Sequence, residues 1–131
     1  MATTDAEQIV NRFVGAWEHN DVDELLEYFT DDAVWHPMPV KPAVGKPAIR
    51  QAISRWLDMV DQLSGEIHLQ VSEGGVVMHE RTDRYLLGGR QVEHAIGAVF
   101  EIENGLITAW REYFDMSDFL VAQDEAPKSE G

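Results

Sequence analysis

Short glycine-containing turns divide the second half of the chain into a series of extended runs. Asn104-Gly105 is the pair most typical of a two-residue hairpin turn, and Gly74-Gly75 and Gly88-Gly89 mark two further turns. Strands joined by such short connections lie side by side and run antiparallel. The pattern therefore predicts an antiparallel meander whose strands cover residues 67–71, 76–86, 90–102 and 106–114.

Apolar and polar residues alternate along the first of these runs. Ile67, Leu69 and Val71 are separated by His68 and Gln70, which indicates a strand with one face in water. We expect the three apolar side chains to face the core.

The first half of the chain has the pattern of helices. Apolar residues recur every four positions from Ile9 to Trp17, behind a capping box formed by Thr4 and Glu7, which predicts a helix from about residue 5 to residue 18. A second, short helix can be capped by Asn20 or Asp21, and Pro47 suits the first turn of a third helix. The buried face of that third helix would consist of Ile49, Ile53, Trp56, Leu57 and Val60.

Three helices followed by a meander of long strands are typical of the α+β class. If the sheet curls around the third helix, the result is a cone-shaped, curved antiparallel sheet packed on three N-terminal helices, with an internal pocket at the open end. We expect a single domain over residues 1–122, including a last helical turn at 117–121, and a flexible C-terminal tail over residues 123–131.

The overall charge argues against several classes of partner. The chain carries 24 acidic and 10 basic residues, a formal net charge of −14, which repels nucleic-acid phosphates and anionic lipid heads. No apolar run is long enough for a membrane span, and the N-terminus lacks the basic and apolar parts of an export signal. The absence of cysteine removes disulfides and thiolate catalysis. We therefore expect a cytoplasmic protein without nucleic-acid or membrane partners.

Strand alternation places ionisable residues on the inner faces of the predicted sheet. Arg81 and Asp83 share a face with Tyr85. Two carboxylates in a desolvated pocket raise each other's pKa, and an arginine between them opposes that effect, so one group can donate a proton while the other accepts one. Charged strand residues commonly face water. The pattern alone therefore does not decide whether these side chains point into a pocket or into solvent. The faces on the neighbouring strands would carry His94, Ile96, Ala98 and Phe100, and Trp110, Glu112 and Phe114.

Residues from about 5 to 121 resemble the limonene-1,2-epoxide hydrolase family, within the nuclear transport factor two-like and SnoaL-like superfamily. The likeness is clearest in three stretches, ELLEYFTDDAVWHPMPVKPAVGKPAI, HERTD and GAVFEIENGLITAWREYFDMSDF. The family's R-x-D strand motif matches Arg81 and Asp83, and the second aspartate of its site corresponds to Glu112. The resemblance implies that Asp83 is the general acid on the epoxide oxygen, Glu112 the general base on water, and Arg81 the bridge between them.

The chain departs from this family at the expected water site. The family places a tyrosine and an asparagine on the short strand after the second helix, where both help to hold the water. Here those positions are Trp35 and Pro37. Trp35 offers a hydrogen-bond donor but no acceptor, and Pro37 offers neither.

His94 supports a second hypothesis. It stands where the epoxide hydrolases carry an apolar residue, and SnoaL-type polyketide cyclases use a histidine and an aspartate in such a cavity. A cyclase or a ketosteroid-isomerase-like enzyme, in which Asp83 and His94 move a proton, is therefore an alternative. A non-catalytic binding module for a small molecule is a third. In each case the pocket walls would include His94, Trp35, Tyr85, Ile96 and Phe114.

The remaining motifs indicate no further ligands. The histidine spacings match no metal-binding motif and no glycine-rich phosphate loop is present, so we expect no metal and no cofactor. We expect Trp17, Trp56 and Trp110 to pack in the core, since each lies on an apolar face. The resemblance also implies a homodimer and a small apolar substrate.

Overall fold

Three helices form the first layer of the molecule. The computed structural model describes residues 4–115. Helix α1 (Asp5–Ala16) starts at the expected capping box, in which the Thr4 side chain accepts a hydrogen bond from the Glu7 amide, and a 3₁₀ turn, η1 (Trp17–His19), follows it. Helix α2 (Val22–Leu26) is capped by Asp21, and α3 (Lys46–Met59) has Pro47 in its first turn. The expected turn at 117–121 and the tail at 123–131 lie outside the described residues.

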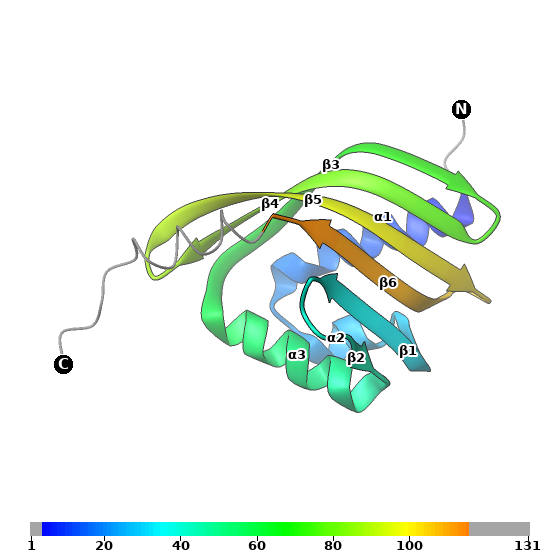
Figure 1. The fold of residues 1–131 in the computed structure, drawn as a ribbon, viewed down its shortest axis with the longest axis horizontal. Helices are drawn as coiled ribbons and strands as arrows, with labels where there is room; N and C mark the ends of the chain where they lie inside the picture. The colour runs from blue at the N-terminus through cyan, green and yellow to red at the C-terminus, as the bar shows by residue number, and fades with distance from the viewer. Residues whose placement is uncertain (1–3, 116–131) are drawn as a thin grey trace.

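A curved sheet of six strands forms the second layer (Figure 1). The strands are β1 (Phe29–Met38), β2 (Ala43–Val44), β3 (Val60–Glu73), β4 (Val76–Leu87), β5 (Arg90–Glu103) and β6 (Leu106–Phe114), and their spatial order is β2-β1-β6-β5-β4-β3. The long strands arch over the helices, with α1 contacting β3 and β4, and α3 contacting β1, β2 and β3. None of the helices within residues 4–115 is long and apolar enough to span a membrane.

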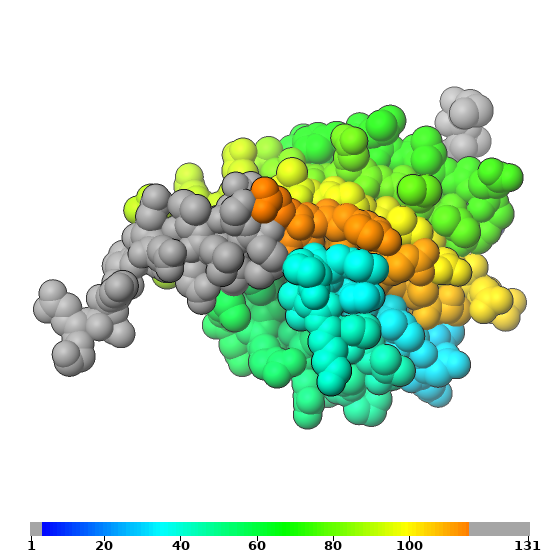
Figure 2. Space-filling view, in the orientation of Figure 1, coloured from blue at the N-terminus to red at the C-terminus, as the bar shows by residue number. Residues whose placement is uncertain are grey.

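The antiparallel meander from β3 to β6 is confirmed, but the complete sheet is mixed. β1 pairs in parallel with β6, so that Trp35 lies opposite Trp110 and Pro37 opposite Glu112. Figure 2 shows β6, in orange, lying between β1, in cyan, and β5, in yellow. No short hairpin joins β1 to β6, so the turn signals that fixed the meander give no information about its direction.

The predicted inner face of β3 is wrong beyond Ile67. The register with β4 shifts between Ile67 and Leu69, a bulge that places one additional residue on β3 and reverses the alternation after it. Leu69 and Val71 are consequently 61% and 59% exposed, whereas Gln70 is directed inward and contacts His79 on β4. A second shift, between Asp61 and Ser64, bends the strand further and helps to curl the sheet over the helices.

The core consists of two apolar clusters. The larger cluster contains a group of packed aromatic rings, in which Phe13 makes edge-to-face contacts with Trp17, Phe29 and Trp110. The smaller cluster consists of Val60, Tyr85, Leu87 and Val92. Along β4, Val77 belongs to the larger cluster and Tyr85 to the smaller one. The stretch between them, where His79, Arg81 and Asp83 lie, is therefore where polar groups enter the interior.

Candidate active site

Arg81 joins two carboxylates that come from different strands. Its Nε and Nη2 atoms donate to the two oxygens of Asp83, at 2.8 and 3.1 Å, and Nη2 also donates to Oε2 of Glu112 on β6. The Arg81 and Glu112 side chains are 6% and 7% exposed, and that of Asp83 is 20% exposed. The two strands are not neighbours, since β5 lies between them, and the curvature of the sheet brings their inner faces together.

The electrostatics of this group favour retention of a proton. Burial raises the pKa of Glu112, and the nearby charge of Asp83 acts in the same direction, while the ion pair with Arg81 and a hydrogen bond from Trp35 oppose it. For Arg81, burial alone would lower the pKa, but the charges of Glu112 and Asp83 outweigh burial and raise it, so the guanidinium stays charged. Burial therefore favours the protonated form of Glu112, beside a guanidinium that stays charged and contacts both carboxylates.

A neutral histidine holds the opposite side of Arg81. Burial, with a further contribution from the charge of Arg81, lowers the pKa of His79 to about 3. In the neutral ring Nε2 accepts from Arg81 Nη1 at 3.1 Å, and Nδ1 donates to Gln70 Oε1 at 2.9 Å. Gln70 Nε2 in turn donates to Oδ1 of Asn11, on α1, at 2.9 Å. The guanidinium is thus held on both sides.

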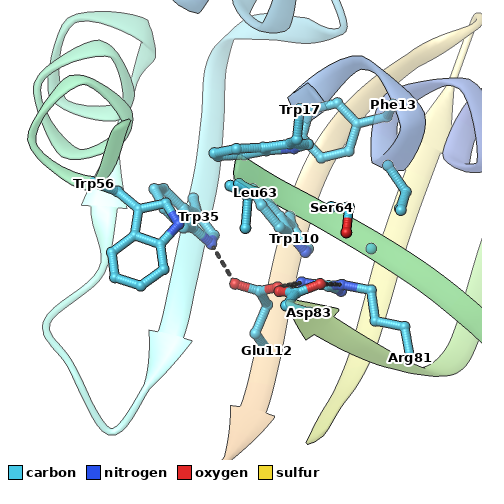
Figure 3. A pocket seen from close by; sticks show the side chains of 12 residues that line it. Phe13, Trp17, Trp35, Trp56, Leu63, Ser64, Arg81, Asp83, Trp110 and Glu112 are labelled. Carbon is cyan, nitrogen blue, oxygen red and sulfur yellow. Dashed lines mark hydrogen bonds and ion pairs between the residues drawn. The ribbon is translucent and has the colours of Figure 1, made fainter. Parts of the chain in front are cut away.

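Two cavities meet at the carboxylates. The larger, about 540 Å³, lies between α3 and the inner faces of β1, β5 and β6, and its walls are mostly apolar. The smaller, about 40 Å³, lies between η1, the end of α1 and the start of β3, and Figure 3 shows its lining. Both cavities are lined by Trp35, Trp56, Asp83 and Glu112. A molecule in the larger cavity would therefore contact the same carboxylates as one in the smaller cavity.

Most of the pocket residues expected from the sequence line the larger cavity, namely His94, Trp35, Ile96 and Phe114. Tyr85 does not line either cavity: it packs in the smaller apolar cluster, and its hydroxyl lies 3.3 Å from His94 Nδ1. His94 Nε2 donates to the carbonyl oxygen of Asp115 at 3.1 Å, because a carbonyl only accepts, so Nδ1 is left to accept from Tyr85. Both nitrogens of this histidine are therefore engaged within the protein.

The two residues at the altered water site also lie at the cavities. Trp35 Nε1 donates to Glu112 Oε1 at 3.2 Å, and Pro37 lines the larger cavity. The indole of Trp35 stacks on that of Trp110, with centroids 4.7 Å apart and planes 7° from parallel. This stacking fixes the direction of the Trp35 N–H, which donates its hydrogen bond to Glu112.

Several residues at the site were not found from the sequence. Strand alternation from Arg81 places His79 on the same face, and that signal could have identified it. Ser64 and Gly65 line the smaller cavity and carried no signal, because they precede the run in which a strand was recognised. Trp17, Trp56 and Trp110 were expected only in the core, and all three also line the smaller cavity. Residues 4–115 contain no cluster of three histidine, aspartate or glutamate side chains able to hold a metal ion.

Comparison with known proteins identifies the family and the fold of the chain. The family described as limonene-1,2-epoxide hydrolase catalytic domain matches residues 4–124. The epoxide hydrolase EphG of Mycobacterium tuberculosis is 31% identical over 117 residues, which cover 85% of this chain and 74% of that protein. A solved structure of an M. tuberculosis LEH-like epoxide hydrolase superposes with a TM-score of 0.80 at 29% identity, covering 95% of this chain and 92% of the other. A Catenulispora acidiphila protein with a ketosteroid isomerase-like fold gives a TM-score of 0.81 at 18% identity, with 88% and 92% of the two chains covered, and shows the shared fold.

Proposed function

The chain belongs to the limonene-1,2-epoxide hydrolase family, and from this we propose that it is an acid/base enzyme that opens the epoxide ring of a small apolar substrate with water. The observation that carries the proposal is the buried guanidinium of Arg81, which holds Asp83 and Glu112 together where they line an apolar cavity. Such a pair supplies an acid and a base in one desolvated place, as the opening of an unactivated epoxide requires.

In the state that reacts, Asp83 carries the proton and Glu112 is ionised, an arrangement that the contacts of Arg81 with both carboxylates allow. Asp83 donates this proton to the epoxide oxygen as the carbon–oxygen bond breaks, and its electron pair stays on that oxygen. Glu112 removes a proton from water as the water oxygen bonds to the same carbon. The product is a vicinal diol, with Asp83 ionised and Glu112 protonated. Because Arg81 contacts both carboxylates, its positive charge balances the one negative charge of the pair, which is on Glu112 before the reaction and on Asp83 after it.

The burial of the two groups supports this division of roles. Glu112 is the more deeply buried, and its raised pKa makes its ionised form a stronger base. Asp83 retains some exposure beside the larger cavity, where an epoxide oxygen would need to approach it. The apolar walls of that cavity favour a substrate with a hydrocarbon body, and they exclude bulk water from the reacting atoms.

The experiment is product analysis after incubation with cyclic and styrene-type epoxides in ¹⁸O-labelled water. We expect a diol that carries one labelled oxygen. Asp83→Asn and Glu112→Gln keep the shape of each side chain but remove its acid or base, so each is expected to slow diol formation roughly 10²- to 10⁴-fold. The exposed residues Asp58 and Glu103 provide matched controls, and Asp58→Asn and Glu103→Gln should leave the rate unchanged.

Two outcomes would contradict the proposal. Diol formation at the wild-type rate in Asp83→Asn would remove Asp83 from the role of acid. No diol from any epoxide would turn the search to the cyclase and isomerase alternative, tested with enolisable ketones and with epoxides that carry an internal hydroxyl group. The contacts of His94 speak against that alternative, since Tyr85 and the Asp115 carbonyl already occupy its two nitrogens.

A further inference from the structure

The smaller cavity has the size and lining of a site for water. At about 40 Å³ it exceeds the roughly 10–15 Å³ that a single water molecule needs, and it is too small for a substrate. Its polar lining includes the hydroxyl-bearing Ser64 and both carboxylates, and the remainder is mostly aromatic and aliphatic. Figure 3 shows Ser64 and Trp110 beside the group formed by Asp83, Glu112 and Arg81.

An unpartnered donor lines this cavity. Among residues 4–115, Nε1 of Trp110 is the one buried side-chain nitrogen or oxygen without a hydrogen-bond partner, and the residue is 2% exposed. Its ring is stacked between Trp35 and Phe100, with centroids 4.7 and 5.6 Å away, so it cannot rotate toward another acceptor. In Figure 3 its nitrogen points toward the carboxylates. A buried donor without a partner is costly, and a water in the adjacent cavity would remove that cost.

Trp35 and Arg81, the two donors that contact the carboxylates, already have hydrogen-bond partners. The N–H of Trp35 is donated to Glu112, and Pro37 has no side-chain donor. The guanidinium of Arg81 is shared among Asp83, Glu112 and His79. Trp110 and Ser64 are therefore the groups best placed to orient a water beside Glu112.

We propose that the smaller cavity holds the water that Glu112 deprotonates, and that Trp110 Nε1 and the Ser64 hydroxyl are its positioning groups. This inference rests on the proposed epoxide-opening function. The water accepts one hydrogen bond from Trp110, and donates one to Glu112 and one to Ser64. Its remaining lone pair is free to attack an epoxide carbon held beside Asp83 and Glu112, which line both cavities. Its proton passes to Glu112 as its oxygen bonds to carbon, and Asp83 protonates the departing oxygen.

The first test does not depend on activity. In protein labelled with ¹⁵N-tryptophan, the four indole N–H signals can be assigned with single Trp→Phe variants. We expect the signal of Trp110 to show a cross-relaxation peak with a long-lived bound water. A crystal structure should show that water within hydrogen-bonding distance of Trp110 Nε1 and Ser64 Oγ. An indole proton with no water contact, together with a cavity free of water density, would overturn the proposal.

The second test separates positioning from binding. Ser64→Ala should lower kcat roughly 10- to 100-fold and leave KM nearly unchanged, because the water is misplaced while the substrate cavity is intact. Ser54→Ala, on α3 and outside both cavities, is the matched control and should behave as wild type. Trp110→Phe should have the same effect as Ser64→Ala. If that variant fails to fold, because it disturbs the aromatic stack, Ser64→Ala and the spectroscopic test still decide the question.

The two proposals fail in different ways. A wild-type protein that forms no diol would overturn the proposed function, and with it the catalytic role of this water, even if the indole signal shows a water contact. A wild-type protein that forms labelled diol, while Ser64→Ala keeps the full kcat and the indole shows no water, would leave the proposed function standing and overturn the water site.

Discussion

At Gly65 the backbone of β3 lies close to the side chains of Val14 and Asp83. A Cβ atom built there would lie 2.9 Å from Val14 Cγ1 and 3.1 Å from Asp83 Oδ1. Both separations are shorter than ordinary van der Waals contact, so the side chains of Val14 and Asp83 would both have to move. Glycine is therefore favoured here by the lack of space beside these two residues.

We expect Gly65→Ala to disturb both the packing of Val14 in the core and the position of Asp83 in the site. Displacement of Asp83 from Arg81 should lower kcat about 10-fold or more, since a small misplacement of a reacting group slows the chemical step strongly. Gly15→Ala is a matched control, because a Cβ at Gly15 in α1 meets no atom within 4 Å. Steady-state kinetics and thermal unfolding of both variants would check this. A Gly65→Ala protein with wild-type kcat would show that Asp83 does not need its observed position.

Hydrogen bonds across three elements hold the arginine in place. Asn11 on α1, Gln70 on β3 and His79 on β4 form a chain of hydrogen bonds that ends at Arg81. Gln70 can take part only because the bulge in β3 turns it inward. The chain depends on a neutral His79, since a protonated ring could not accept from the guanidinium. Protonation of His79 at low pH should therefore break this chain of hydrogen bonds and destabilise the fold.

The pH dependence of stability should report on His79. Its pKa is lowered from 6.5 to about 3 on folding, so below pH 6.5 the unfolded chain binds the proton more readily. The stability linked to this group is complete above pH 6.5 and is lost progressively as the pH falls toward 3. Between pH 7 and pH 5 the loss is about 2 kcal/mol in the free energy of unfolding. Denaturant unfolding at both pH values should show this loss in wild type and a smaller one in His79→Gln.

The control for that measurement is His68→Gln, since His68 is exposed on β3. This variant should keep the wild-type loss between pH 7 and pH 5. Equal losses in wild type and His79→Gln would mean that His79 is not held neutral by its surroundings.

The sequence was most informative where local signals decide the structure. Glycine-containing turns determine the meander, and the helix caps at Thr4 and Asp21 determine where two helices begin. The bulge after Ile67 and the parallel pairing of β1 with β6 depend on contacts distant in sequence.

The prediction of the site is limited in the same way, because part of it depends on contacts between residues distant in sequence. Alternation and family resemblance led to Arg81, Asp83 and Glu112, which lie on regular parts of their strands. Ser64 and Gly65 lie just beyond a register shift in β3, so no periodic pattern pointed to them. The donor of Trp110 could not have been singled out either, because whether a buried N–H has a partner depends on packing from several elements.

In the molecule as a whole, the two apolar clusters enclose a short polar stretch that carries one guanidinium and two carboxylates. Burial makes two ionised carboxylates costly there, and the single positive charge stabilises a pair that holds one proton. In the proposed reaction, that state would supply an acid and a base together. The curvature of the sheet lets Arg81 on β4 reach Glu112 on β6 across the intervening strand β5.

The most direct test of this one-proton pair is the pH–rate profile of diol formation. The raised pKa of Glu112 implies that the last proton leaves the pair above the ordinary carboxyl range, so the rate should fall on the alkaline side as the acid is lost. On the acid side, protonation of both carboxylates removes the base. A bell-shaped profile of kcat/KM is therefore the expected result. A rate that stays level or rises steadily from acid to alkaline pH would contradict a shared proton between Asp83 and Glu112.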